Sequence, residues 1–283
     1  MRQFSSGADR APPDPVNSPG VTKPKVSWLG GTFSWLLPED GQNVTYPPAP
    51  EGTLIYVIGD IHGRIDLLEE LWVRIDRDAP KAQSHEVLEI YLGDYIDRGP
   101  ASAKVVDLLT QRPKGRKRVF LRGNHEKVLE DFLKGEALLD AWCAIGGLET
   151  LMSYGVEPNL LRHPRDNDAV RADLAARMPD SHHSFLSGLQ SHYSAGDYFF
   201  VHAGVRPGIA LDKQGEHDCL WIREEFLEHD DNFGRIVVHG HSPVSAPELL
   251  PNRINLDTAA YATGQLSCLK ISRQGARLLE IGD

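Results

Sequence analysis

The sequence predicts an α/β fold with two packed sheets, and three observations support this prediction. In the first half of the chain, three apolar strands each lead through a polar loop into an amphipathic helix, which is the pattern of parallel βαβ units. Short strands with short connections fill the last third, which indicates a second, largely antiparallel sheet packed on the first. The chain has 283 residues, 41% of them hydrophobic, so it can bury a core without help from disulfides or metals.

The three strand and helix units follow one another without interruption. The run TLIYVIG from Thr53 is apolar throughout, as in a strand buried on both faces, and the next segment, IDLLEELWVRI, is apolar at helical spacing. The strand EVLEIYLG and the helix ASAKVVDLLTQ form the second unit, with Pro100 near the first turn of the helix. The strand KRVFLRG and the helix NHEKVLEDFLKG form the third, and Gly135 is the expected stop.

The remaining segments complete the predicted organisation. Residues 137–189 read as a helical insert, and later strands are expected within YFFVHAG, RIVVHGH, RINLD, LSCLKIS and ARLLEIG. Residues 1 to about 50 are rich in Pro, Ser and Gly and are expected to form a mobile arm. The predicted domains are therefore this arm, 1–50, and one folded domain, 51–283.

Composition excludes several classes of function. The chain carries 30 Lys and Arg against 40 Asp and Glu, a formal charge of −10, which argues against a nucleic-acid partner or an anionic membrane. The three cysteines lie far apart and form no CxxC pair, so neither a disulfide framework nor a thiolate zinc site is expected. No secretory signal and no membrane-spanning apolar run is recognisable, so we expect a cytoplasmic protein.

Polar residues that suit metal ions follow five of the predicted strands. The loops are GDIHG, GDYIDRG and RGNHE in the first half, and HAG and HGH in the second. Ligand sites of open α/β sheets lie beyond the carboxyl ends of the strands, so these loops are expected to meet. One such motif alone is more often a turn or a hydrogen-bonded core histidine than a ligand, but all five together predict a metal site.

The ligand types favour two ions. We expect Asp60 and His62 to bind the first and Asp94 to bridge both, whereas Asn124, His202 and His241 complete the second. Mixed nitrogen and oxygen ligands without sulfur suit Mn, Fe or Zn better than Mg or Ca. Two such ions can deprotonate a bridging water and hold a phosphoryl group for in-line displacement.

These five motifs, in this order, resemble those of the phosphoprotein phosphatase family of calcineurin-like metallophosphoesterases. Further segments, WCAIGGLETLMSYG, LWIREEF and HGHSPVSAPELLPNRINLDTAAYATGQL, resemble its bacterial branch. The resemblance implies two packed mixed β-sheets flanked by helices, in four layers α/β/β/α, and makes 51–283 the catalytic domain. It also implies two divalent ions, with manganese expected in vitro and iron or zinc as alternatives.

The resemblance also assigns roles residue by residue. It makes His125 the general acid and Asp97 its carboxylate partner, and it assigns the grip on the substrate phosphate to Arg98 and Arg122, with Arg223 as a third candidate. In HGH the second histidine matches the family's ligand, so His239 is expected to be a packing residue. The other histidines, including the pair His182 and His183, are assigned to the surface.

The expected activity is hydrolysis of phosphoserine or phosphothreonine in proteins, with phosphotyrosine left open, by direct attack of a metal-bridging hydroxide. Two alternatives stay open. A symmetrical dinucleoside tetraphosphate hydrolase has a similar fold and similar motifs, although such enzymes usually depart from the DRG sequence present at Asp97, Arg98 and Gly99. A non-catalytic module that binds phosphoproteins is the alternative of another class. The expected partner is a phosphoprotein or phosphopeptide, and the sequence does not indicate an oligomeric state.

Overall fold

The computed structural model describes residues 44–82, 86–112, 115–162 and 166–279. Most of the predicted arm, residues 1–43, lies outside them. Within the described part, Tyr46 is buried and the Ala49 amide donates a hydrogen bond to the Ser272 carbonyl at 2.8 Å. The packed part of the chain therefore includes residues from Val44 onward, ahead of the boundary near residue 50 that composition predicted.

The first sheet contains the three predicted parallel strands together with the last two strands of the chain. Its order is β10-β9-β1-β2-β3. The parallel strands are β1 (Thr53–Ile58), β2 (Glu86–Tyr91) and β3 (Lys117–Phe120), and the two others are β9 (Cys268–Ser272) and β10 (Gly275–Leu278). Strand β9 pairs antiparallel with β1, with Ile55 opposite Ile271, so the two final strands do not belong to the second sheet, contrary to the sequence prediction.

The second sheet has the order β4-β5-β6-β8-β7. Its strands are β4 (His192–Ala195), β5 (Tyr198–Val201), β6 (Ile236–His239), β7 (Glu248–Leu249) and β8 (Arg253–Asn255). The central pairs β5 with β6 and β6 with β8 are parallel, and only the outer pairs are antiparallel. The prediction of a largely antiparallel sheet was therefore wrong, because short connections in sequence do not report which strands become neighbours.

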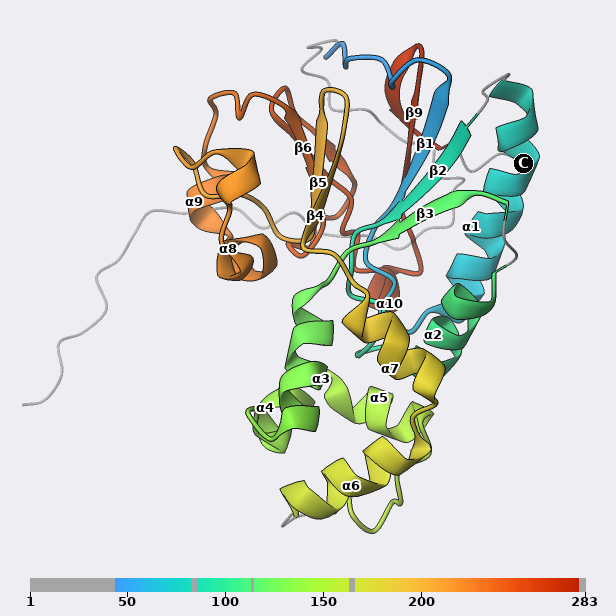
Figure 1. The fold of residues 1–283 in the computed structure, drawn as a ribbon, viewed down its shortest axis with the longest axis vertical. Helices are drawn as coiled ribbons and strands as arrows, with labels where there is room; N and C mark the ends of the chain where they lie inside the picture. Colours follow the sequence, from blue (N-terminus) through green and yellow to red (C-terminus); the bar gives the residue numbers. More distant parts are fainter. Residues whose placement is uncertain (1–43, 83–85, 113–114, 163–165, 280–283) are drawn as a thin grey trace, which may run out of the picture. The chain divides into compact units, whose positions relative to one another are not determined.

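Four layers follow from the alternation of side chains along the strands. Leu54 and Tyr56 of β1 face helices α1 (Ile65–Asp78) and α2 (Ser102–Gln111), whereas Ile55 and Val57 face the second sheet across a shared core. The outer face of the second sheet packs against α8 (Glu216–Trp221) and α9 (Glu224–Leu227). Figure 1 shows these helices on the two outer sides of the paired sheets.

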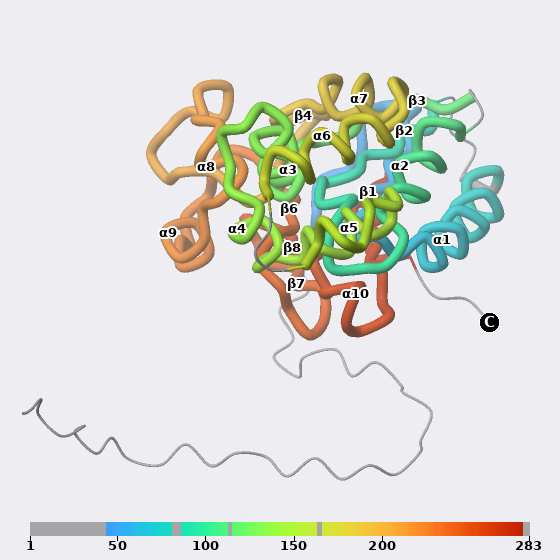
Figure 2. The backbone as a smooth tube through the Cα atoms, turned by 90° about the horizontal axis from the view of Figure 1, so that it is seen from below, coloured from blue at the N-terminus to red at the C-terminus, as the bar shows by residue number. Residues whose placement is uncertain are grey.

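The described part of the predicted helical insert contains four helices. They are α4 (Leu139–Ala144), α5 (Gly147–Ser153), α6 (Asn167–Arg177) and α7 (Asp180–Ser187). With α3 (Asn124–Lys134) they form a group that Figure 2 shows from below, in front of the strands. The remaining helix, α10 (Ala260–Thr263), follows β8, and short 3-10 turns lie at Ala79–Ala82 and Leu211–Lys213. Within the described residues, no helix is both long and apolar enough to span a membrane.

Candidate metal and phosphate site

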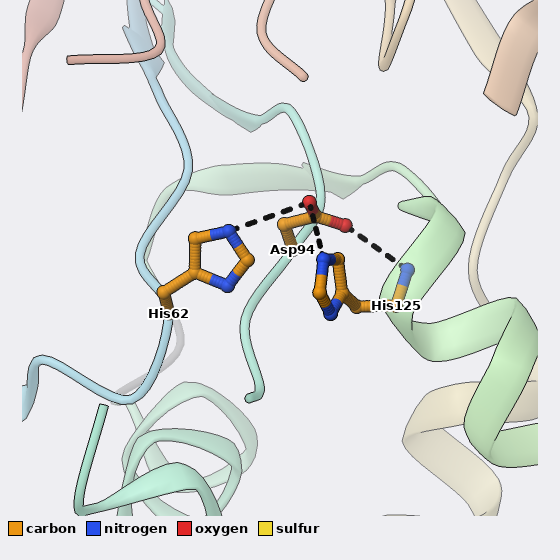
Figure 3. A group of neighbouring side chains, drawn as sticks. All are labelled: His62, Asp94 and His125. Carbon is orange, nitrogen blue, oxygen red and sulfur yellow. Dashed lines mark hydrogen bonds and ion pairs between the residues drawn. The ribbon is translucent and has the colours of Figure 1, made fainter. Parts of the chain in front are cut away.

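The loops after β1, β2, β3, β5 and β6 bring the predicted ligands together around Asp94. One group of side chains that could hold a metal ion is His62, Asp94 and His125, and a second is Asp94, His202 and His241. Figure 3 shows the first group, with both imidazole rings directed at the Asp94 carboxylate. Asp94 Oδ2 lies 3.5 Å from His62 Nε2, and its Oδ1 lies 3.4 Å from His202 Nε2, so the two oxygens face different groups.

Asp60 and Asn124 lie within the same arrangement. The backbone N–H of His241 donates to Asp60 Oδ2 at 2.9 Å, and Asp60 Oδ1 is buried without a hydrogen-bond partner. The amide oxygen of Asn124 lies 2.9 Å from His202 Nε2 and 2.9 Å from His241 Nδ1. The structure thus brings all six predicted ligands to one place.

The donor atoms fit a cation. His62 and His202 each have Nδ1 within 3.0 Å of a backbone carbonyl, of Ile96 and Leu92, so that nitrogen carries the proton and Nε2 presents a lone pair. The lone pair of His202 faces the Asn124 oxygen, and His62 Nε2 has no hydrogen-bond partner. Converging lone pairs without a proton between them are the arrangement that a metal ion satisfies.

Electrostatics support the same conclusion. Burial raises the pKa of Asp60, and the nearby carboxylates of Asp257 and Asp94 raise it further. Burial lowers the pKa of His62 to about 3, which keeps the ring neutral and available as a ligand. Several buried carboxylates in one place need a counter-charge, which divalent cations supply.

His125 differs from the other histidines of the site. Its Nδ1 lies 2.7 Å from Asp97 Oδ2, which leaves Nε2 on the side of Asp94. Burial alone would lower the pKa of His125, but the Asp94 and Asp97 carboxylates outweigh that effect and raise it. By contrast, burial lowers the pKa of His202 and of His241. A protonated ring suits a proton donor and a neutral ring suits a ligand, so the opposite directions of these pKa shifts are consistent with different expected roles.

The three candidate phosphate-binding arginines are placed differently. Arg223 donates to the carbonyl of His241 at 3.3 Å, and the guanidinium of Arg98 lies 4.9 Å from the ring centre of Tyr261, which itself contacts His62. Both arginines therefore border the candidate metal ligands. Arg122 instead forms ion pairs with Glu130 and Glu216, at 3.2 Å each.

Backbone conformation marks the same loops. The described residues include six non-glycine positions with positive φ: His62, Asp94, Asp97, Arg98, His241 and Ala259. Five of these six are predicted site residues. L-residues rarely adopt this conformation, and such strain gathers where the surrounding structure holds a functional side chain in place.

Two acidic residues of the site were not predicted. Glu126 accepts backbone hydrogen bonds from Asp94 at 2.9 Å and Tyr95 at 2.8 Å, and so fixes the loop that carries Asp94. Asp257, after β8, is buried, and its Oδ2 has no hydrogen-bond partner. The glutamate in RGNHE, three residues after a glycine that precedes a helix, was a readable capping signal. No comparable signal marks Asp257.

Among the described residues, two other histidines are buried. His239 has its ring 4.9 Å from that of Phe226 and its Nδ1 3.0 Å from the Gly240 carbonyl, as a packing residue would. His182 is fully buried in α7, with its two nitrogens 2.8 Å from Tyr154 Oη and 2.9 Å from Asp107 Oδ1. The assignment of His182 to the surface was therefore wrong. It rested on the polar residues beside His182 in the sequence, which do not indicate its two tertiary hydrogen bonds.

Comparisons with known proteins agree with this geometry. The chain is 26% identical over 238 residues to the asymmetrical bis(5'-nucleosyl)-tetraphosphatase PrpE of Oceanobacillus iheyensis, covering 76% of this chain and 88% of that protein. It is also 26% identical over 238 residues to serine/threonine-protein phosphatase 2 of Escherichia coli, covering 77% and 92%.

A solved structure described as a candidate diadenosine tetraphosphatase shares the fold, with a TM-score of 0.52 at 23% identity, over 85% of this chain and 96% of that chain. The sequence model of the calcineurin-like phosphoesterases matches residues 53–271, a range that contains every candidate ligand. The chain therefore belongs to the calcineurin-like phosphoesterase family, whose members are metal-dependent hydrolases of phosphate esters.

Proposed function

We propose that the protein is a phosphomonoesterase that acts on phosphoserine and phosphothreonine in proteins, with two divalent metal ions. The observation that carries the proposal is the buried pair of His125 and Asp97, with 2.7 Å between Nδ1 and Oδ2. The oxygen that leaves phosphoserine is an alkoxide, which is a poor leaving group unless it is protonated as the bond breaks. A histidine that is held by a carboxylate, and whose pKa that carboxylate helps to raise, is suited to this task.

Each group of side chains has a defined task. Asp60, His62 and Asp94 would hold one ion, and Asp94, Asn124, His202 and His241 the other. Bound divalent ions would supply Lewis acidity, which lowers the pKa of water and offsets the charge of the phosphate. Arg98 and Arg223 would bind the phosphate oxygens with their planar guanidinium groups, and His125 would give the proton on Nε2 to the departing oxygen.

Arg122 could bind the substrate phosphate only by giving up its present ion pairs. Its guanidinium is held by Glu130 and Glu216, so binding of a phosphate there would have to compete with two carboxylates. We therefore assign the main grip on the phosphate to Arg98 and Arg223, and an auxiliary role to Arg122.

A second activity, hydrolysis of dinucleoside tetraphosphates, is favoured by the names of relatives such as the PrpE protein of Oceanobacillus iheyensis. Its leaving group is a nucleotide phosphate, which departs without a general acid far more readily than an alkoxide does. The two activities therefore differ in how strongly they depend on His125. Asymmetrical cleavage of diadenosine tetraphosphate by water gives ATP and AMP, whereas symmetrical cleavage gives two ADP.

The test is to remove metal, restore Mn, Zn, Fe or Mg singly, and compare phosphate release from phosphopeptides with cleavage of diadenosine tetraphosphate. We expect phosphopeptides to be the better substrates, and His125→Ala and Asp97→Asn to lower kcat on them by about 100-fold or more. Faster cleavage of the dinucleotide would contradict the proposal, as would turnover of phosphopeptides that both variants leave unchanged. Purified protein without metal-dependent turnover of any phosphoester would instead support the binding-module alternative.

A further inference from the structure

The carboxylate of Asp97 accepts three hydrogen bonds, and two of them come from the helical insert. His125 Nδ1 and Trp142 Nε1 lie 2.7 Å and 2.9 Å from Oδ2, and the hydroxyl of Thr150 lies 2.6 Å from Oδ1. Asp97, Trp142 and Thr150 are each fully buried, so water does not share these contacts. Trp142 belongs to α4 and Thr150 to α5, far from the motif that carries Asp97.

The same insert holds the backbone on which Asp97 sits. Asp97 and Arg98 adopt φ values of 67° and 65°, a conformation that costs free energy in L-residues and that other contacts must therefore stabilise. The N–H of Asp97 donates to the hydroxyls of Thr150 at 2.9 Å and Ser102 at 3.0 Å. The N–H of Arg98 donates to the carbonyl of Gly146 at 3.0 Å.

The insert packs in direct contact with the turn. A Cβ on Gly146 would lie 2.6 Å from Cγ of Arg98 and 2.7 Å from its backbone nitrogen. A Cβ on Gly147 would lie 2.6 Å from the indole of Trp142, so the α5 backbone lies directly on that ring and fixes the direction of its N–H. The segment WCAIGGLET is thus shaped around the turn that presents Asp97.

We propose that Trp142 and Thr150 are positioning residues, which fix the Asp97 carboxylate so that His125 presents Nε2 to the leaving oxygen. The inference rests on the proposed phosphomonoesterase function. Transfer of a proton in the transition state depends on sub-ångström placement of the donor, and a carboxylate held at both oxygens cannot rotate away from the imidazole. Loss of either donor therefore weakens general-acid catalysis while the metal ligands stay in place.

Dependence on the leaving group separates this role from a merely structural one. Phosphoserine peptides release a strongly basic alkoxide that needs the acid, whereas 4-nitrophenyl phosphate releases an acidic phenol that departs without it. We expect Trp142→Phe and Thr150→Val each to lower kcat on a phosphoserine peptide by about tenfold or more, with kcat on 4-nitrophenyl phosphate changed by less than about twofold and KM little altered. Equal losses on both substrates would overturn the proposal.

Three matched variants sharpen the test. Trp72→Phe makes the same change at another buried indole, which donates to Tyr91 Oη at 2.9 Å and lies under the guanidinium of Arg112. We expect both activities to be unchanged in this variant. Thr150→Ser keeps the hydroxyl and should restore turnover of the peptide. In an Asp97→Asn background, Thr150→Val should not lower kcat on the phosphoserine peptide any further relative to kcat on 4-nitrophenyl phosphate, because Thr150 acts through the Asp97 carboxylate. A full additional loss there would refute the inference.

A readout without substrate distinguishes failure of this inference from failure of the proposed function. The Nδ1 proton of His125, bonded to a buried carboxylate, should give a low-field NMR signal that exchanges slowly with water. Thr150→Val should accelerate that exchange by about tenfold or more, by loosening Asp97. Unchanged exchange would contradict the positioning role, whatever the substrate proves to be. Absence of monoester turnover in the wild-type enzyme would contradict the proposed function alone.

Discussion

Glu89 in β2 allows a test of the packing of the first sheet. Its side chain is fully buried, and its carboxylate forms ion pairs with three arginines. Its Oε1 lies 2.9 Å from Arg112 and 3.0 Å from Arg116, and its Oε2 lies 3.2 Å from Arg118 and accepts from Tyr91 Oη at 2.8 Å. Glu89→Gln keeps the size of the side chain but removes its negative charge. It also places an NH2 group, which cannot accept a hydrogen bond, beside groups that donate. Losing one partner of a buried ion pair typically costs about 3–5 kcal/mol.

The lower end of that range applies here. The side chains of Arg112, Arg118 and Arg116 are 6%, 14% and 20% exposed, so water can partly replace the lost carboxylate. We expect Glu89→Gln to lower the free energy of unfolding by about 3 kcal/mol at pH 7, measured by urea denaturation with circular dichroism. Glu70→Gln is the matched control, since Glu70 pairs with Arg74 on the surface of α1; its effect should stay below about 0.5 kcal/mol.

The stabilising effect of Glu89 should depend on pH in a defined direction. Burial alone would raise the pKa of Glu89, but Arg112 and its neighbours outweigh burial and lower it. A lowered pKa in the folded state stabilises the fold fully above the unfolded value, about 4.3, and this contribution is lost as the pH falls through the folded value. The advantage of the wild type over Glu89→Gln should therefore be constant from pH 7 to 5 and shrink below pH 4.3. A difference below about 0.5 kcal/mol at pH 7, or one that grows as the pH falls, would refute the reasoning.

Three further predictions concern the site and the core. Gly99→Ala should lower turnover by about 100-fold or more, because its Cβ would lie 2.0 Å from the carbonyl oxygen of His62; steady-state kinetics on well-folded protein would show this, and wild-type rates would contradict it. Chelation of metal should lower Tm by several degrees, and a divalent ion should restore it, because binding to the folded state alone stabilises it; an unchanged Tm in calorimetry would argue against the site. Burial raises the pKa of the Cys219 and Cys268 thiols, so Cys143 alone should react with a thiol reagent in the native protein, and two or more modified thiols by mass spectrometry would refute the packing.

Local patterns in the sequence predicted the elements and the place of the site. The run at β1 is buried on both faces, and its alternating side chains supply two cores. The ligand loops could be placed at one edge because the carboxyl ends of parallel strands meet there. Residues such as Asp60 and His241, far apart in sequence, are linked as a direct result, by a hydrogen bond of 2.9 Å.

What the sequence did not disclose depends on tertiary pairing. The apolar pattern of β9 predicts that this strand is buried, but it does not predict that β9 pairs with β1. Asp257 carries no motif, and its importance arises only from the charges of Asp60 and Asp94 nearby. Likewise, the matching segment WCAIGGLET indicated relationship, but only the structure shows its indole and hydroxyl on Asp97.

The pairing of β9 with β1 has a consequence for how the enzyme comes into being. Strand β1 lies early in the described part of the chain, yet Ile55 finds its partner Ile271 only when nearly all of that part has been synthesised. Until then, the central strand of the first sheet has an open, apolar edge, which is a site for mispairing and aggregation. Contacts of such long range also slow folding. We therefore expect the nascent polypeptide to depend on chaperones that shield this edge, and the active site to form late, after the last strands have been released from the ribosome.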